Sequence, residues 1–354
     1  MLQISPINNR TNYCPQTRLT MAKPLLKDTV SFKSKGTLMA DHLENSVNKN
    51  MDRLNRIATI FLDVLESVAI RLKNMGVTFD REYCEKNIIK SAKSFVSKII
   101  RSGSTTVPDQ IRATLYIDNP YDLSILNDYL LPELKKRGYV IAKDERSLPD
   151  LDIRLADMEN KAEKLSPELR KSISHPQKSG YEDIQMRLVR NFESRKNPIL
   201  HELIILFGPN YAQAKHLESE KVYSFLRLFN ELGVKQIGNS ENSHYKFVMR
   251  FVDLINKMFN GKISQKLYEN AKNKDLYGIT EEIPITFSDQ DICVFIDYFK
   301  RLQKELSLYY KEEKLSKPEE AAQLNKAIRN DRAIIEKIRK NLLETIDYFS
   351  SASN

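Results

Sequence analysis

Apolar residues recur at steps of three and four in the first and last parts of the chain, and this spacing is typical of one face of an amphipathic α-helix. The first stripe begins at Leu54, and Gly76, which follows it, is a suitable helix stop. The helical pattern begins near Asp41, and together the stripes predict helices over about 41–75, 82–101, 247–258, 292–310 and 324–349.

The stripe over 324–349 keeps a four–three spacing that Asp331 interrupts at one position. Two interpretations of it stay open. A coiled-coil seam would join copies of the chain into a homo-oligomer. Packing against the rest of its own domain is favoured, because fewer than about four clean heptads are present.

The middle of the chain changes to short apolar runs and alternating stretches, which are typical of β-strands. The run over 200–207 is almost wholly apolar, as a central strand would be. Helical pattern is expected over 121–136 and in part of 152–172. Strands are predicted at 112–117, 139–144, 183–190 and 200–207. Strands separated by helices indicate a sheet domain of the α+β or α/β class.

The composition narrows the class of protein. The chain has 354 residues, 41% of them hydrophobic and 29% charged, so it can bury a core without disulfides. Its three cysteines lie far apart, which argues against a disulfide scaffold or a zinc ribbon and favours a reducing, cytoplasmic location. No run approaches the ~18 uninterrupted apolar residues of a membrane span, so no membrane partner is expected.

The formal net charge of +9 comes mostly from residues 1–38, which carry six basic residues and one acidic residue. This segment lacks sustained periodicity and is predicted to be a disordered basic tail. It has no apolar stretch of the kind that a secretory signal needs, and a targeting role stays open as the alternative. The charge of the remaining chain is therefore weak ground for nucleic-acid binding.

Two carboxylates lie near the starts of predicted strands: Asp109 precedes 112–117, and Glu202 comes early in 200–207. Charged groups are rarely buried in apolar strands without a partner. Two carboxylates that converge at a sheet edge can hold Mg²⁺ for phosphate chemistry. Two separate, solvated carboxylates are the simpler alternative.

A basic segment and a glycine–tyrosine pair add to this pattern. Lys90, Ser94 and Lys98 are spaced four apart and would share one face of the expected helix over 82–101. With Arg112 they could hold a polyphosphate, and a solvated face is the alternative. An exposed Tyr181 after Gly180 could stack on a base, whereas the alternative is a turn followed by a half-buried tyrosine.

Four stretches of the chain occur in a characteristic order: KSAKSFVSK (90–98), PDQIRATLYIDNPYDL (108–123), SGYEDIQMRLV (179–189) and HELIILFGPNYAQAKHLESEKVY (201–223). Their order and spacing resemble the synthetase domain of the RelA/SpoT family, over roughly residues 82–235. The resemblance implies an α+β fold with a nucleotidyltransferase-like mixed β-sheet flanked by helices. It divides the chain into the tail (1–38), a synthetase domain with N-terminal helices (39–235) and a helical C-terminal region (236–354).

The resemblance also implies a reaction, in which the pyrophosphoryl group of ATP moves to the ribose 3′-hydroxyl of a guanine nucleotide to make (p)ppGpp. Asp109 and Glu202 would hold Mg²⁺, and Glu202 would help to activate the hydroxyl. Tyr181 would stack on the guanine, and Arg112 would contact the donor phosphates. Further nucleotide-binding positions correspond to Lys90, Ser94, Lys98, Lys215 and Tyr223.

The chain departs from the family pattern in ways that keep other functions open. Ile204 replaces a glutamine, Leu206 a cation, Glu220 a histidine and Ile88 an arginine. One alternative is a toxin-type member that modifies adenine nucleotides or the 3′ end of tRNA. Another is a degenerate, non-catalytic nucleotide-binding or interaction module. In a third, the C-terminal helices regulate an active synthetase domain. No histidine is followed directly by aspartate, so the hydrolase activity of bifunctional members is not expected.

Overall fold

The computed structural model describes residues 48, 51–91, 110–119, 123–142, 151–156, 161–190, 199–226, 243–312 and 318–351. The expected tail and three expected site residues (Ser94, Lys98 and Asp109) lie outside this part of the chain. The chain divides into two compact units, 1–177 with 182–212 and 178–181 with 213–354. The expected boundary after residue 235 falls in a range that the structure does not describe.

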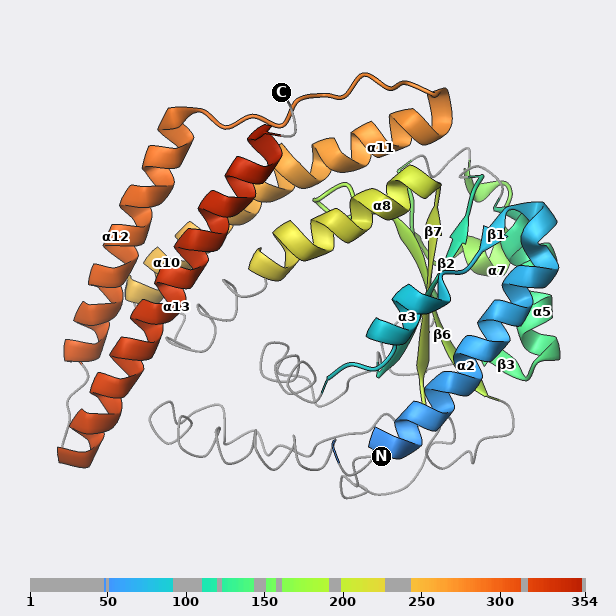
Figure 1. The fold of residues 1–354 in the computed structure, drawn as a ribbon, viewed down its shortest axis with the longest axis horizontal. Helices are drawn as coiled ribbons and strands as arrows, with labels where there is room; N and C mark the ends of the chain where they lie inside the picture. The colour runs from blue at the N-terminus through green and yellow to red at the C-terminus, as the bar shows by residue number, and fades with distance from the viewer. Residues whose placement is uncertain are drawn as a thin grey trace. The chain divides into compact units, whose positions relative to one another are not determined.

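The first unit is built on a mixed seven-stranded sheet with the order β1-β2-β7-β6-β4-β5, in which β3 also pairs with β6. Strands β2, β7 and β6 of this sheet are labelled in Figure 1. Strands β2 and β7 run parallel at its centre, and β6 is antiparallel to β7. This arrangement belongs to the α+β class. The strands are β1 (Val77–Thr78), β2 (Ile111–Ile117), β3 (Tyr139–Ile141), β4 (Leu151–Arg154), β5 (Ile173–Ser174), β6 (Asp183–Arg190) and β7 (His201–Phe207).

One face of this sheet packs into the apolar core. Helix α2 (Met51–Leu72) buries Phe61, Leu65 and Val68 in a cluster with strand residues such as Leu115 and Ile205. The three- and four-residue steps expected on the first helix are therefore confirmed as its buried face. The other helices of this unit are α3 (Arg81–Asn87), α5 (Leu131–Lys136), which follows the π-helical turn η3 (Leu126–Leu130), and α7 (Pro167–Arg170).

The end of the first helix is also where the sequence places it. After the short 3₁₀ turn η2 (Lys73–Met75), Gly76 adopts a left-handed conformation with φ of 74°. A Cβ atom added there would lie 3.2 Å from Cβ of Asp118, so the position favours glycine for both its backbone and its surroundings.

The expected helix over 82–101 is wrong over residues 88–91, and its remainder, 92–101, lies outside the described residues. Helix α3 ends at Asn87, and Ile89 forms an antiparallel bridge with Ile111. The N–H of Arg112 donates to the carbonyl of Ile88 (2.7 Å) and that of Lys90 to the carbonyl of Gln110 (3.2 Å). Strand β1 pairs only with the last residues of β2, so the segment after α3 supplies backbone partners for the start of β2.

The expected helical pattern in part of 152–172 is confirmed, although the range begins with a strand. Residues 161–162 and Pro167–Arg170 are α-helical, whereas Leu151–Arg154 form β4. Leu151 and Ile153 alternate with Asp152 and Arg154, but four residues are too few for a period of two to stand out. Pairing with β6 makes this segment a strand.

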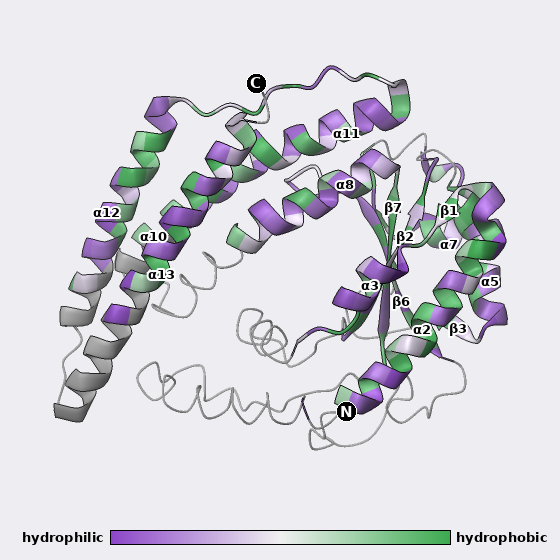
Figure 2. Cartoon of the chain, viewed as in Figure 1, coloured by the Kyte–Doolittle hydropathy of each residue, from purple (hydrophilic) through white to green (hydrophobic). Residues whose placement is uncertain are grey.

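The second unit is helical. Helix α8 (Pro209–Glu218) follows β7, belongs to the second unit from Gln213 onward and leads into η4 (Ser219–Tyr223). Further along lie α10 (Ser243–Met258), η5 (Phe259–Ser264), α11 (Gln265–Tyr277), α12 (Asp289–Glu312) and α13 (Pro318–Ser351). Polar and apolar residues alternate around the long helices (Figure 2). None of the helices in the described ranges is long and apolar enough to cross a membrane.

The apolar stripe of α13 packs inside this second unit. Its residues join a cluster with aromatic side chains of α10 and α12, where the rings of Phe251 and Tyr298 stack with centroids 4.9 Å apart. From Ile335 onward the stripe is therefore buried within its own unit, as the small number of heptads favoured. Its buried members are Ile335, Ile338, Leu342, Ile346 and Phe349.

Candidate functional site

The face of the sheet opposite the core carries a row of charges across three central strands. Glu202 of β7 lies directly beside Arg112 of β2 and Arg187 of β6 in the strand register. The guanidinium of Arg112 donates through Nε to Oε2 of Glu202. The Glu202 side chain is only 8% exposed, whereas that of Arg112 is 42% exposed. A buried carboxylate is thus paired with a guanidinium that is partly exposed to solvent.

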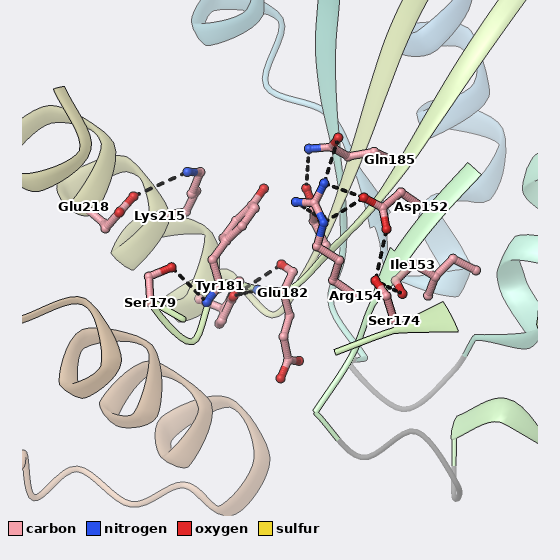
Figure 3. Close-up of polar contacts among 12 residues, drawn as sticks. Asp152, Ile153, Arg154, Ser174, Ser179, Tyr181, Glu182, Gln185, Lys215 and Glu218 are labelled. Carbon is pink, nitrogen blue, oxygen red and sulfur yellow. Dashed lines mark hydrogen bonds and ion pairs between the residues drawn. The ribbon is translucent and has the colours of Figure 1, made fainter. Parts of the chain in front are cut away.

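The same face continues with a second charged cluster (Figure 3). Arg154 of β4 contacts Asp152 at 2.6 Å, Asp183 at 3.1 Å and Gln185 at 3.2 Å. The hydroxyl of Ser174 donates to Asp152 (3.1 Å). Asp183 is fully buried, so Arg154 offsets the cost of placing its charge in the sheet. These contacts tie β5, β4 and the start of β6 together.

In the second unit, four side chains form a closed set of contacts around Tyr181, which we call the Tyr181 lock: Tyr181, Lys215, Glu218 and Tyr268. The ammonium of Lys215 lies over the Tyr181 ring, 4.2 Å from its centroid. Glu218 accepts from Lys215 (3.4 Å) and from the hydroxyl of Tyr268 (3.3 Å). The rings of Tyr181 and Tyr268 are 5.8 Å apart. Lys215 also lies 5.6 Å from the ring centroid of Tyr223.

This environment corrects one expectation from the sequence. Tyr181 is 5% exposed, not the open stacking platform that its place after a glycine suggested. A buried aromatic ring with a cation on its face gains both apolar burial and cation–π attraction. Tyr223, in contrast, is half exposed on η4.

The chain matches no model of a known protein family, and no curated protein is significantly similar to it.

The expected site residues fall into two groups, one in each unit. Arg112 and Glu202 form an ion pair in the first unit. Tyr181, Lys215 and Tyr223 come together in the second. Lys90 lies on the segment that pairs with the start of β2, not on the helix face expected from its spacing. Ser94, Lys98 and Asp109 lie outside the described residues.

The positions that depart from the family pattern differ in their surroundings. Ile204 and Leu206 share a face with Glu202 and are buried, 8% and 2% exposed. This part of the face is therefore apolar where the family has polar or cationic groups. Glu220 is exposed, and Ile88 is buried beside β2.

The residues of the second charged cluster, around Arg154, were not singled out from the sequence, and neither were Arg187, Glu218 and Tyr268. Arg187 could have been found, because it alternates with Met186 and Leu188 on β6 and so must lie on the non-core face. Glu218 had no distinguishing signal among the charged residues of its helix. Tyr268 is 50 residues from Glu218 along the chain, so only tertiary folding brings them together.

The expected Mg²⁺ ligands are only half represented in the described residues. Glu202 is present but accepts a hydrogen bond from Arg112, and Asp109 is outside the described part. Among the described residues, no group of three or more His, Cys, Asp or Glu side chains is arranged to hold a metal ion.

His201, next to Glu202, lies on the other face and in a different environment. Its ring is fully buried between Phe61 (4.8 Å) and Tyr139 (5.3 Å). Burial, with a smaller effect from Arg190, lowers the pKa of His201 to about 4. The imidazole is therefore neutral at physiological pH and belongs to the core, whereas its neighbour Glu202 faces the charged row.

Proposed function

We propose that the sheet unit is a nucleotidyltransferase-like domain and that the protein transfers pyrophosphate from ATP to the ribose 3′-hydroxyl of a guanine nucleotide. The observation that carries this proposal is the pairing of Arg112 with Glu202 on adjacent parallel strands. These residue types stand at the two motif positions where the resemblance to RelA/SpoT-type synthetases assigns phosphate binding and activation of the hydroxyl.

The proposed chemistry needs positioning and neutralisation of charge more than covalent catalysis. The 3′-hydroxyl oxygen attacks the β-phosphorus of ATP, the bond to the α–β bridging oxygen breaks, and AMP leaves. Arg112 would neutralise donor phosphate charge, and Glu202 would accept the proton of the hydroxyl. Mg²⁺ held by Asp109 and Glu202 would supply further neutralisation of the phosphates.

A second candidate is a non-catalytic nucleotide-binding or interaction module. It is favoured by the apolar surroundings of Ile204 and Leu206 and by the burial of Tyr181. Loss of polar groups from the face that carries Glu202 weakens binding of a polyphosphate, and a buried tyrosine has little surface for stacking.

Product analysis separates these functions. The full chain is incubated with γ-³²P-ATP, Mg²⁺ and one acceptor at a time: GDP, GTP, AMP, ADP or bulk tRNA. Label is expected on GDP or GTP, and Glu202→Gln should lower the rate by at least about 100-fold. Glu168→Gln, an exposed carboxylate on α7, is the matched control and should keep the wild-type rate.

Other outcomes point elsewhere. Label on AMP, ADP or tRNA would replace the guanine acceptor by that of a toxin-type member. Absence of transfer to every acceptor by the folded protein would support the non-catalytic module. Equal rates for wild type and Glu202→Gln would remove Glu202 from the mechanism.

A further inference from the structure

The loop that carries Tyr181 is held by helix α11 of the C-terminal region through its backbone as well as its side chain. Gln265 donates through Nε2 to the carbonyl of Lys178 (2.8 Å). Gly180 has φ of 80°, and a Cβ atom added there would lie 3.6 Å from Cα of Gln265. Glycine thus lets the loop turn while it lies directly against α11.

Glu218 joins the two sides of the Tyr181 lock. Its side chain is 5% exposed. It accepts one hydrogen bond from Lys215, which lies over the ring of Tyr181, and one from the hydroxyl of Tyr268 on α11. A carboxylate this deeply buried needs such donors. In turn, its charge keeps the Lys215 ammonium where it covers the ring.

The position of Lys215 has a consequence for any aromatic ligand. An ammonium 4.2 Å from the ring centroid occupies the space in which a stacked base would lie. Tyr268 is itself almost fully buried, so it cannot move aside without disturbing α11. Stacking on Tyr181 therefore requires Lys215 to leave the ring.

We propose that the Tyr181 lock is an autoinhibitory contact, through which Glu218 and Tyr268 of the C-terminal unit keep Tyr181 closed to a nucleotide base. Opening the lock would free the ring and let the Lys215 ammonium turn toward an anionic group. The closed ring and its opening stand on the contacts alone, whereas the effect on transfer rests on the proposed function.

The chain contains no tryptophan, so Tyr181→Trp creates a single fluorescent reporter inside the lock. In this background we compare Glu218→Gln, which removes the charge that holds Lys215, and Tyr268→Phe, which removes only one hydroxyl. The matched control is Glu269→Gln, which makes the same charge change at an exposed position of α11, next to Tyr268 in the sequence. Acrylamide quenching reports exposure of the indole, and circular dichroism shows that each variant is folded.

We expect quenching of the introduced indole to be weak in the Tyr181→Trp parent and in Glu269→Gln, and several-fold stronger in Glu218→Gln and Tyr268→Phe. With Tyr181 retained, the affinity for GDP measured by calorimetry should rise about tenfold in Glu218→Gln, as loss of one charge-assisted hydrogen bond allows. Tyr268→Phe should raise it less.

The outcomes distinguish this inference from the proposed reaction. If the two lock variants open the ring and bind GDP more tightly but no variant transfers pyrophosphate, the lock stands and the pyrophosphokinase proposal fails. If wild type transfers pyrophosphate and the lock variants bind GDP no better, the lock is not autoinhibitory. Quenching equal to that of Glu269→Gln in both lock variants would overturn the lock itself, because Tyr268→Phe is too small a change to unfold the chain.

Discussion

At the scale of single residues, the first unit buries carboxylates that face arginines across the sheet. Glu202 pairs with Arg112, and Asp183 pairs with Arg154. A buried ion pair adds little net stability over an apolar pair, but the loss of one partner leaves a charge without compensation. Substitution of these arginines should therefore destabilise the chain more than substitution of the exposed lysines and arginines of the helices.

Arg154→Leu should lower the free energy of unfolding by about 3 kcal/mol, because it strips the fully buried Asp183 of the cation beside it. The double variant Arg154→Leu/Asp183→Asn should recover part of this loss. Urea unfolding followed by circular dichroism measures both. Lys86→Ala, in an exposed pair with Glu82, should leave the midpoint unchanged. A double variant no more stable than Arg154→Leu would contradict the pairing.

His201 should make stability depend on pH. Its folded pKa, lowered by burial to about 4, is below the ordinary value of 6.5, so the unfolded chain takes up a proton first as pH falls. The contribution of neutral His201 to the free energy of unfolding is fully present above pH 6.5 and is lost progressively down to about pH 4. The loss amounts to about 2 kcal/mol by pH 5.

Urea unfolding at pH 7.5 and pH 5.0 checks this expectation. His201→Phe should remove most of the difference, since phenylalanine suits a site between two aromatic rings. His175→Gln replaces an exposed histidine and should retain the difference. An equally strong pH dependence in His201→Phe would show that other groups cause it.

At the scale of elements, two glycines illustrate how context decides the effect of one substitution. Gly180 has a left-handed backbone and lies against α11, whereas Gly261 lies in η5 with nothing within 4 Å of an added Cβ. The first position is strained for any L-residue, and the second is a helical position at which glycine is a poor helix former.

Gly180→Ala should lower the stability of the chain by about 1 kcal/mol, and Gly261→Ala should raise it by up to about 1 kcal/mol. Both variants add one methyl group, so each serves as the control for the other in thermal unfolding. Stabilisation by Gly180→Ala would show that the loop before β6 does not hold the left-handed turn.

At the scale of the whole molecule, each compact unit has its own apolar cluster. The cluster of the second unit takes up the stripe of α13, so this stripe contributes to folding of the single chain. A seam between copies would instead leave these side chains exposed in the monomer.

Leu342→Ala should therefore lower the free energy of unfolding by about 2–5 kcal/mol without changing the oligomeric state. Circular dichroism and light scattering after size-exclusion chromatography measure the two effects. Leu343→Ala, the same change at a half-buried neighbour, should cost less. A change in mass at constant stability would support the coiled-coil interpretation.

The long amphipathic helices and the apolar central strands could be predicted from the sequence, because their periodicity extends over many residues. Helix α2, its glycine stop and strands β2, β6 and β7 follow from local pattern alone. Short elements could not be predicted in this way. Strand β4 and the segment after α3 are extended because neighbouring strands need backbone partners.

The candidate site could likewise be predicted only in part from the sequence. The motif spacing singled out Arg112, Glu202, Tyr181 and Lys215, but Tyr268, whose ring contacts that of Tyr181, lies on α11, beyond the stretch that the resemblance covers. Only the tertiary structure placed Arg187 beside Glu202 and Tyr268 beside Glu218, and only burial shows that Tyr181 is closed. Contacts between residues far apart in the chain depend on strand register and helix packing, and local sequence pattern carries no record of either.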